Sequence, residues 1–230
     1  MSGTTTRAPR GLFRLRHETL DTIFGYAYAI LMVDVLLVLA NLPLAVMLLV
    51  ARDLLQAWPL LLVLSLTVAP SLAGAFEVYR SMGEGQPRPF AAFWHGYRRR
   101  GAAAALAGLA AVLVVGFVLY DGAIVGGTVW AVLLGPTLLV VALLALVTAV
   151  ATIAGLTVFA SASLRATAKA ALYLSVRRWY SSVLALVLLG LIVVALLMQP
   201  VLGALAPGLL LYPVFANAHY AFRRVLEREA

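Results

Sequence analysis

The stretch FWHGYRRRGAAAALAGLAAVLVVGFVLY, residues 93–120, places three arginines directly before a long run without any charge. The same succession recurs along the chain, because all but one of its 17 basic residues fall in four clusters. The clusters are Arg7/Arg10/Arg14/Arg16, Arg80/Arg88/Arg98/Arg99/Arg100, Arg165/Lys169/Arg177/Arg178 and Arg223/Arg224/Arg228. Each interval between clusters is long enough for two membrane crossings, and Lys and Arg collect in cytoplasmic loops. The pattern therefore predicts six transmembrane helices in three hairpins, with both termini in the cytoplasm.

The composition supports a membrane protein. The 230 residues are 64% hydrophobic and 11% charged, with a mean hydropathy of +1.03, whereas a soluble domain carries about 25% charged residues. We interpret the net charge of +8 as a cytoplasmic collar that contacts anionic lipid headgroups, and we expect no nucleic acid partner. The chain has no cysteine, which excludes disulfides and thiolate metal sites.

The predicted fold class is all-α, a polytopic membrane helical bundle in the cytoplasmic (inner) membrane. Residues 22–220 form one transmembrane domain, between a cytoplasmic N-terminal segment at 1–21 and a cytoplasmic tail at 221–230. The predicted spans are residues 22–50, 58–79, 101–120, 128–160, 181–198 and 202–220. The cytoplasmic loops, at about 80–100 and 161–180, each carry an amphipathic interfacial helix. The similar starts of the third and fifth predicted spans fit either a tandem parallel repeat or convergence.

Asp34 is the sharpest candidate for a functional side chain within the membrane, where a carboxylate is costly unless it is neutralised or paired. Asn41 lies seven positions on, along the same helix face. Pro43 frees the carbonyl of Leu39 and can kink the helix. These groups can form a polar site for a proton, a cation or a sugar hydroxyl. The alternative is that Asp34 only makes a hydrogen bond to a neighbouring helix, as packing polar residues do.

A second candidate site lies on the cytoplasmic face, where side chains can contact a protein partner or lipid headgroups. Glu77 and Arg80 are three residues apart and can pair. The contact residues predicted for this face are Glu77, Arg80, Phe93, Trp94, Arg98, Arg99, Arg100, Arg165 and Lys169. The spacing of the three histidines does not favour a metal site. We expect no catalytic residue and no cofactor, because the sequence does not place a nucleophile and a base together at the same depth in the membrane.

Three stretches resemble the YesL-like family of bacterial membrane proteins, domain of unknown function 624: NLP at 41–43, APSLAGAFEVYR at 69–80 and PRPFAAFWHGYRRR at 87–100. The resemblance covers about residues 10–110. It implies a companion of carbohydrate uptake systems with no settled biochemical activity, and ABC-type sugar transporter components as partners.

Three functions are consistent with these patterns. The first, which we favour, is a non-enzymatic accessory or partner subunit in bacterial carbohydrate uptake. The second is a stand-alone transporter or channel for a small solute, with its polar site around Asp34 and Asn41, which requires a water-accessible cavity at Asp34. The third, a membrane enzyme, ranks last for want of clustered polar residues. The sequence does not indicate the substrate or the oligomeric state.

Overall fold

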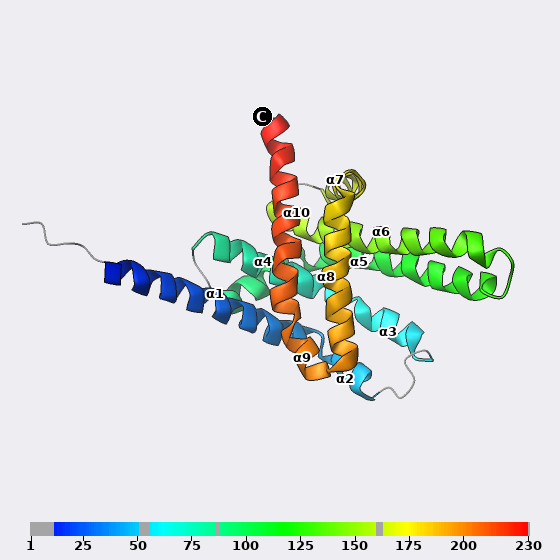
Figure 1. Ribbon diagram of the computed structural model, residues 1–230, viewed down its shortest axis with the longest axis horizontal. Helices are drawn as coiled ribbons and strands as arrows, with labels where there is room; N and C mark the ends of the chain where they lie inside the picture. Colours follow the sequence, from blue (N-terminus) through cyan, green and yellow to red (C-terminus); the bar gives the residue numbers. More distant parts are fainter. Residues whose placement is uncertain (1–11, 51–55, 86–87, 160–162, 230) are drawn as a thin grey trace, which may run out of the picture.

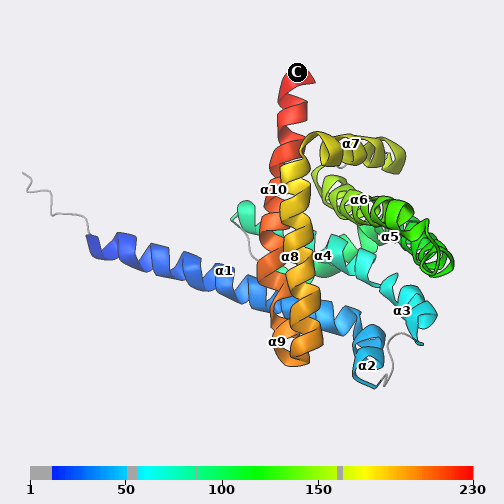
Figure 2. The same ribbon diagram turned by 45° about the vertical axis from the view of Figure 1, so that its right-hand side comes forward.

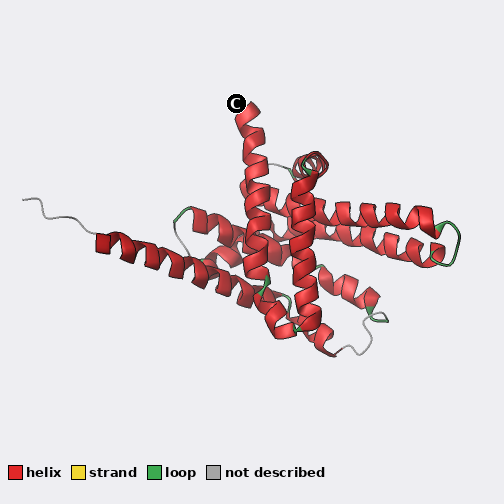
Figure 3. Cartoon of the chain, viewed as in Figure 1, coloured by secondary structure: helices red, strands yellow, loops and turns green. Residues whose placement is uncertain are grey.

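The computed structural model describes residues 12–50, 56–85, 88–159 and 163–229, and within these ranges every regular element is a helix (Figure 3). This confirms the all-α fold class. The predicted external turn at Arg52 and Asp53, and the first basic residues Arg7 and Arg10, lie outside the described residues.

The first two predicted spans are each interrupted once. The first consists of α1 (Leu12–Ala40) and α2 (Leu42–Val50), and the second of α3 (Trp58–Ser65) and α4 (Val68–Gly83). Prolines explain both positions, because a proline ring clashes with the carbonyl four residues earlier and supplies no N–H to it. Pro43 acts in this way on Leu39, and Pro70 acts on Leu66, beside the respective interruptions.

The next pair of helices is longer than predicted. Helix α5 (Pro89–Val125) is continuous, and α6 (Ala131–Val158) returns beside it (Figure 1). The separate interfacial helix predicted around 90–100 is therefore wrong: these residues form the first turns of α5. At 37 residues, α5 extends about 55 Å, well beyond a hydrocarbon core of about 30 Å, so its basic end can project from the bilayer without a break.

The last third of the chain forms α7 (Leu164–Arg177), α8 (Trp179–Met198), α9 (Pro200–Leu205) and α10 (Pro207–Glu229). Helix α7 lies across α8, as an interfacial helix would beside a spanning one (Figure 2). Helix α10 returns alongside α8, and both views show this pair crossing the direction of α5 and α6 (Figures 1 and 2). The helices therefore do not share one axis.

Among the residues that the structure describes, five helical segments are long and apolar enough to cross a membrane: Ile23–Ala40, Pro59–Gly83, Pro89–Val125, Ala131–Val158 and Trp179–Met198. They expose many large apolar side chains, such as Leu113, Phe117 and Val187, as lipid-facing helices do. Helix α10, the predicted sixth span, is not among the five. The multi-pass membrane architecture is thus supported, while six remains a predicted count.

The core lies where α1, α4, α5, α6 and α10 meet. One close contact in this core joins α4 to α5 at Gly96. A Cβ atom there would lie 2.6 Å from the Cβ of Glu77 and 2.8 Å from the carbonyl oxygen of Ala73. A residue without a side chain is therefore what lets the two helices approach so closely. This contact positions the ends of α4 and α5 that carry the basic residues.

Candidate functional site

Asp34 lies in the core and contacts a neighbouring helix. Its side chain is on α1, the residue is 2% exposed, and its Oδ1 accepts a hydrogen bond of 2.5 Å from the backbone N–H of Gly208. Gly208 is the second residue of α10, where a backbone N–H has no acceptor within its own helix. Asp34 therefore caps α10 from a distant part of the chain.

The contact around Gly208 joins three helices. The hydroxyl of Tyr79 on α4 donates a hydrogen bond of 2.7 Å to the carbonyl oxygen of Gly208. A Cβ atom on Gly208 would lie 2.6 Å from the carbonyl oxygen of Ile30 and 2.8 Å from both carboxyl oxygens of Asp34. Gly208 can therefore pack against Ile30 and Asp34 of α1 at this distance only because it has no side chain.

Asn41 has a different set of partners. Its Nδ2 donates to Oγ of Ser71 at 2.8 Å and to the carbonyl oxygen of Leu37 at 2.9 Å. Its Oδ1 accepts from the hydroxyl of Thr67 at 2.8 Å. Thr67 lies between α3 and α4, so Asn41 connects the interruption in the first span to the interruption in the second.

The polar stripe predicted from Asp34, Asn41 and Pro43 is therefore divided between two structural contacts. Asp34 bonds to α10, Asn41 bonds to the start of α4, and Pro43 lies in the first turn of α2. Neither of the two cavities described below is lined by any of these three residues. The contacts of Asp34 therefore support the alternative role, a hydrogen bond that holds two helices together.

A cavity of about 380 Å³ lies at the basic end of α4 and α5, and its charged side chains come from α4, α5 and α10. It is lined by Glu77, Arg80, Glu84, His95, Gly96, Arg99, Arg100, Thr157, Val158, His219 and Arg223. The structure thus brings together two of the four basic clusters around one space: the second contributes Arg80, Arg99 and Arg100, and the fourth contributes Arg223. Helix α6 closes the cavity with Thr157 and Val158. Gly208 and the cavity residues His219 and Arg223 were not among the predicted site residues, because no local motif links them to their partners on other helices.

Glu77 is the least exposed charged group in this cavity. Its side chain is 10% exposed, and it pairs with Arg80 at 2.5 Å between Oε1 and Nη2. Arg80 also pairs with Glu84 at 2.5 Å, while Nδ1 of His95 lies 3.7 Å from Oε1 of Glu77. The predicted pairing of Glu77 with Arg80 is confirmed, and both glutamates of the cavity are engaged by the same arginine.

The aromatic residues at the start of α5 divide between core and surface. Phe93 is 0% exposed and packs against Gly74 of α4, which corrects its prediction as a partner or lipid contact. The structure stacks Phe93 on Tyr97 and places Trp94 edge-on to both rings. Trp94 is half-buried in this cluster, and Phe90 is exposed. Phe90 is thus the aromatic side chain of this segment that is open to a partner.

The remaining predicted contact residues lie at the surface. Arg98 and Arg99 on α5, and Arg165 and Lys169 on α7, are exposed. Arg100 is half-buried and its Nη1 lies 3.5 Å from the carbonyl oxygen of Phe159, so it reaches the end of α6. Within the described residues, the side chains of Arg98, Arg165 and Lys169 make no hydrogen bond or ion pair, so they are free for the predicted contacts with a partner or with lipid headgroups.

Helix α7 leaves large apolar side chains exposed. Its buried residues are Thr167, Ala171, Leu174 and Ser175. Leu172 and Val176 are 46% and 60% exposed, and Arg165 and Lys169 lie beside them. The outward surface of α7 is therefore mixed, apolar and basic together, rather than divided into one apolar and one basic side.

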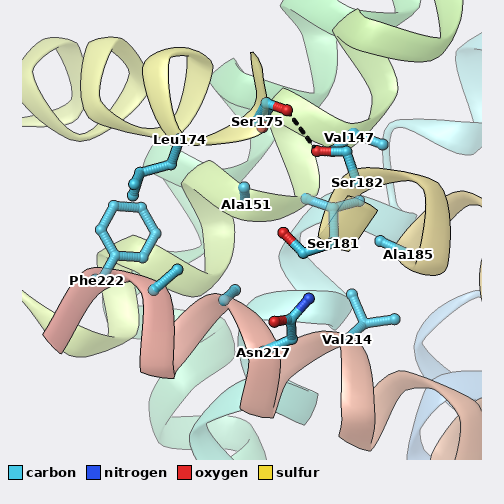
Figure 4. A pocket seen from close by; sticks show the side chains of 13 residues that line it. Val147, Ala151, Leu174, Ser175, Ser181, Ser182, Ala185, Val214, Asn217 and Phe222 are labelled. Atoms are coloured by element: carbon cyan, nitrogen blue, oxygen red, sulfur yellow. Dashed lines mark hydrogen bonds between the residues drawn. The ribbon is translucent and has the colours of Figure 1, made fainter. Parts of the chain in front are cut away.

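A second, much smaller cavity of about 50 Å³ lies between α6, α7, α8 and α10. Ser181, Ser182 and Asn217 surround it, and Oγ of Ser182 donates a hydrogen bond of 2.8 Å to the carbonyl oxygen of Ser175 (Figure 4). A space of this size with polar walls can hold water. The small volume and the hydrogen bond from Ser182 to Ser175 indicate that this cavity belongs to the packing of α7 against α8 and is not a site for a solute.

Within the described ranges, no three His, Asp or Glu side chains lie together in an arrangement that could hold a metal ion. His17 lies where only the backbone of α1 is described. The carboxyl and imidazole groups of the large cavity are Glu77, Glu84, His95 and His219, and the cavity's other ionisable residues are arginines. Its chemistry is thus that of ion pairing and hydrogen-bond donation.

Residues 30–122 match the family model described as "Protein of unknown function, DUF624", which confirms the predicted resemblance. The matched segment runs from α1 through most of α5 and includes Asp34, Asn41 and Glu77. Comparison with curated proteins gives no match, and comparison with solved structures gives none.

Proposed function

We propose that this multi-pass membrane protein is a non-enzymatic accessory subunit of bacterial carbohydrate uptake. The proposal is supported by the match of residues 30–122 to the DUF624 family model and by several helices that are long and apolar enough to cross a membrane. The protein is held in the cytoplasmic membrane with both termini in the cytoplasm, and it works by contact with components of an ABC-type sugar transporter. The observation that carries the proposal is the exposed mixed face of α7.

That face has the properties of a contact surface. Leu172, Tyr173 and Val176 are all more than a third exposed on α7, and two cationic side chains, Arg165 and Lys169, flank them. In the proposed orientation α7 lies at the cytoplasmic surface of the bilayer, where a cytosolic ATPase or a neighbouring permease can reach it. Exposed apolar residues bordered by charges are common at protein–protein contacts.

The interior supports an accessory role over transport. A solute path through the first span requires Asp34 or Asn41 to face an aqueous space. Asp34 instead caps α10, and Asn41 bonds to Thr67 and Ser71. Both side chains hold helices together in this arrangement.

The test is site-specific photo-cross-linking in intact cells. A photoreactive amino acid replaces Leu172 on α7, and in the matched control it replaces Leu139 on α6, which is 58% exposed and lies within a predicted span. We expect a sugar transporter component to cross-link from position 172 and not from position 139. Lipid adducts alone at both positions, or the same proteins at both, would contradict the proposal.

The carbohydrate assignment has its own measurement. Uptake of radiolabelled oligosaccharides is compared in a deletion strain that carries either the intact chain or Val176→Asp. We expect Val176→Asp to reduce uptake as the deletion does, while its amount in the membrane stays normal. If the deletion itself leaves the uptake of every sugar in the panel unchanged, the protein does not act in carbohydrate uptake, whatever its partner is.

One observation favours a second candidate, a stand-alone transporter. Two interrupted spans meet at Asn41, and transporters place discontinuous helices at their binding sites. This candidate predicts solute uptake by the purified chain in proteoliposomes and its loss in Asn41→Ala. Absence of uptake for protons, cations and sugars would leave the accessory role as the function.

A further inference from the structure

The cavity at the basic end carries an excess of positive charge. Four arginines line it, Arg80, Arg99, Arg100 and Arg223, against two glutamates, Glu77 and Glu84. They come from α4, α5 and α10, so the excess is produced by the tertiary structure and not by one run of sequence. Like charges around a common space repel one another, and an anion within it relieves that repulsion.

The glutamates do not neutralise all four arginines. Both pair with Arg80. Throughout the described ranges, no ion pair involves Arg99 or Arg223, and both residues are exposed. These two guanidinium groups, one on α5 and one on α10, are therefore the cations best placed to meet an anion that enters the cavity.

The donors and the volume point to one kind of anion. A guanidinium group offers paired N–H donors that match the oxygens of a phosphate. A cavity of about 380 Å³ is within the range of small-molecule sites, and it has room for a phosphate and an organic group attached to it. His95 and His219 add further nitrogen atoms to the wall.

We propose that this cavity is a binding site for a phosphate group, held by Arg99 and Arg223 from two helices, with Arg80 kept in place by Glu77. The phosphate has two possible sources, the headgroup of an anionic phospholipid and a soluble phosphate monoester. The chemistry of recognition is the same for both. The proposal does not depend on a role in carbohydrate uptake.

The experiment uses the full chain in nanodiscs. In the first arm the bilayer is phosphatidylcholine alone, and inorganic phosphate and glycerol 3-phosphate are titrated by calorimetry. In the second arm the protein is equilibrated with phosphatidylglycerol, and retained lipid is measured by native mass spectrometry. Binding in the first arm identifies a soluble ligand, and binding in the second alone identifies a lipid headgroup.

Two double variants decide whether the cavity is responsible. Arg99→Gln with Arg223→Gln removes two cavity charges. Arg98→Gln with Arg224→Gln removes the neighbouring charges on the same two helices, which do not line the cavity. We expect the first pair to weaken binding by about tenfold or more, and the second pair to leave it within about twofold of the wild type.

Three results would overturn the proposal: binding in neither arm, equal weakening by the two double variants, or full binding by the first. Equal weakening would identify a diffuse cationic surface. If the first double variant does not elute as a folded protein, Arg99→Lys with Arg223→Lys replaces it. That pair keeps the charge but loses the paired donors, so it must still bind phosphate more weakly than the control pair.

Discussion

The contact between Asp34 and Gly208 gives the most direct test of how this chain is held together. Asp34→Ala removes the acceptor of a buried hydrogen bond and leaves the N–H of Gly208 without it, which costs about 1–3 kcal/mol. Asp34→Asn keeps an oxygen that can accept the same bond. We therefore expect Asp34→Asn to restore most of the stability that Asp34→Ala loses.

Gly208→Ala tests the same contact from the other side. Among the described residues only Gly85 has a positive φ, so alanine is compatible with the backbone at 208 and its cost is steric. The new methyl group would meet the carbonyl oxygen of Ile30 at 2.6 Å and the Asp34 carboxyl group at 2.8 Å. Overpacking of this kind costs about 1–3 kcal/mol.

The assay is reversible unfolding in bicelles by increasing fractions of SDS, followed by tryptophan fluorescence. Asp34→Ala, Gly208→Ala and the double variant form a cycle, and we expect the double variant to lose less than the two single losses added together. The reason is that Asp34→Ala removes part of the clash that Gly208→Ala creates. Wild-type stability for both single variants would refute the packing of α10 on α1 and with it the structural role of Asp34.

Three further substitutions are measured by the same unfolding assay. Tyr79→Phe keeps the ring in its aromatic cluster but removes the donor to Gly208, and we expect a loss of about 0.5–1.5 kcal/mol; no loss would mean that this hydroxyl bonds elsewhere. Asn41→Ala removes the hydrogen bonds to Ser71 and Thr67 on the other span. Both hydroxyls keep a backbone carbonyl to donate to, so we expect a loss of about 0.5–1.5 kcal/mol for each bond, and a neutral result would show that the two interruptions are not coupled energetically. Phe93→Ala opens a cavity in the α4–α5 contact and should cost about 3–5 kcal/mol, against less than about 0.5 kcal/mol for the exposed Phe90→Ala, and equal losses would contradict the placement of these two rings.

Sequence reasoning was most accurate where one local property determined the outcome. The apolar runs predicted where long helices lie, because a membrane-spanning segment must satisfy its backbone hydrogen bonds internally. The proline at 43 indicated where the first of them is interrupted. The aromatic spacing at 90–97 predicted a helix correctly, but it could not show that this helix continues into the next apolar run. Periodicity reports a helical face, and continuity depends on whether the helix has a neighbour to pack against along its whole length.

The candidate sites required more than periodicity. Asp34 and Asn41 share a helix face in the sequence, yet their hydrogen-bond partners are Gly208 in one case and Ser71 and Thr67 in the other. Likewise Arg99 and Arg223 belong to separate basic clusters and line the same cavity. Neither pairing follows from spacing, because the partners lie on different helices.

The amino-acid sequence alone determined that the chain is helical, that it is a membrane protein, and that its basic residues lie in clusters between apolar runs. These properties follow from composition and from the length of chain needed to cross a bilayer. Only the tertiary structure decided that Asp34 caps α10, that Phe93 is a core residue, and that three basic segments surround one cavity. Helices in lipid are selected by close packing and by hydrogen bonds between partners, and those depend on which helices become neighbours.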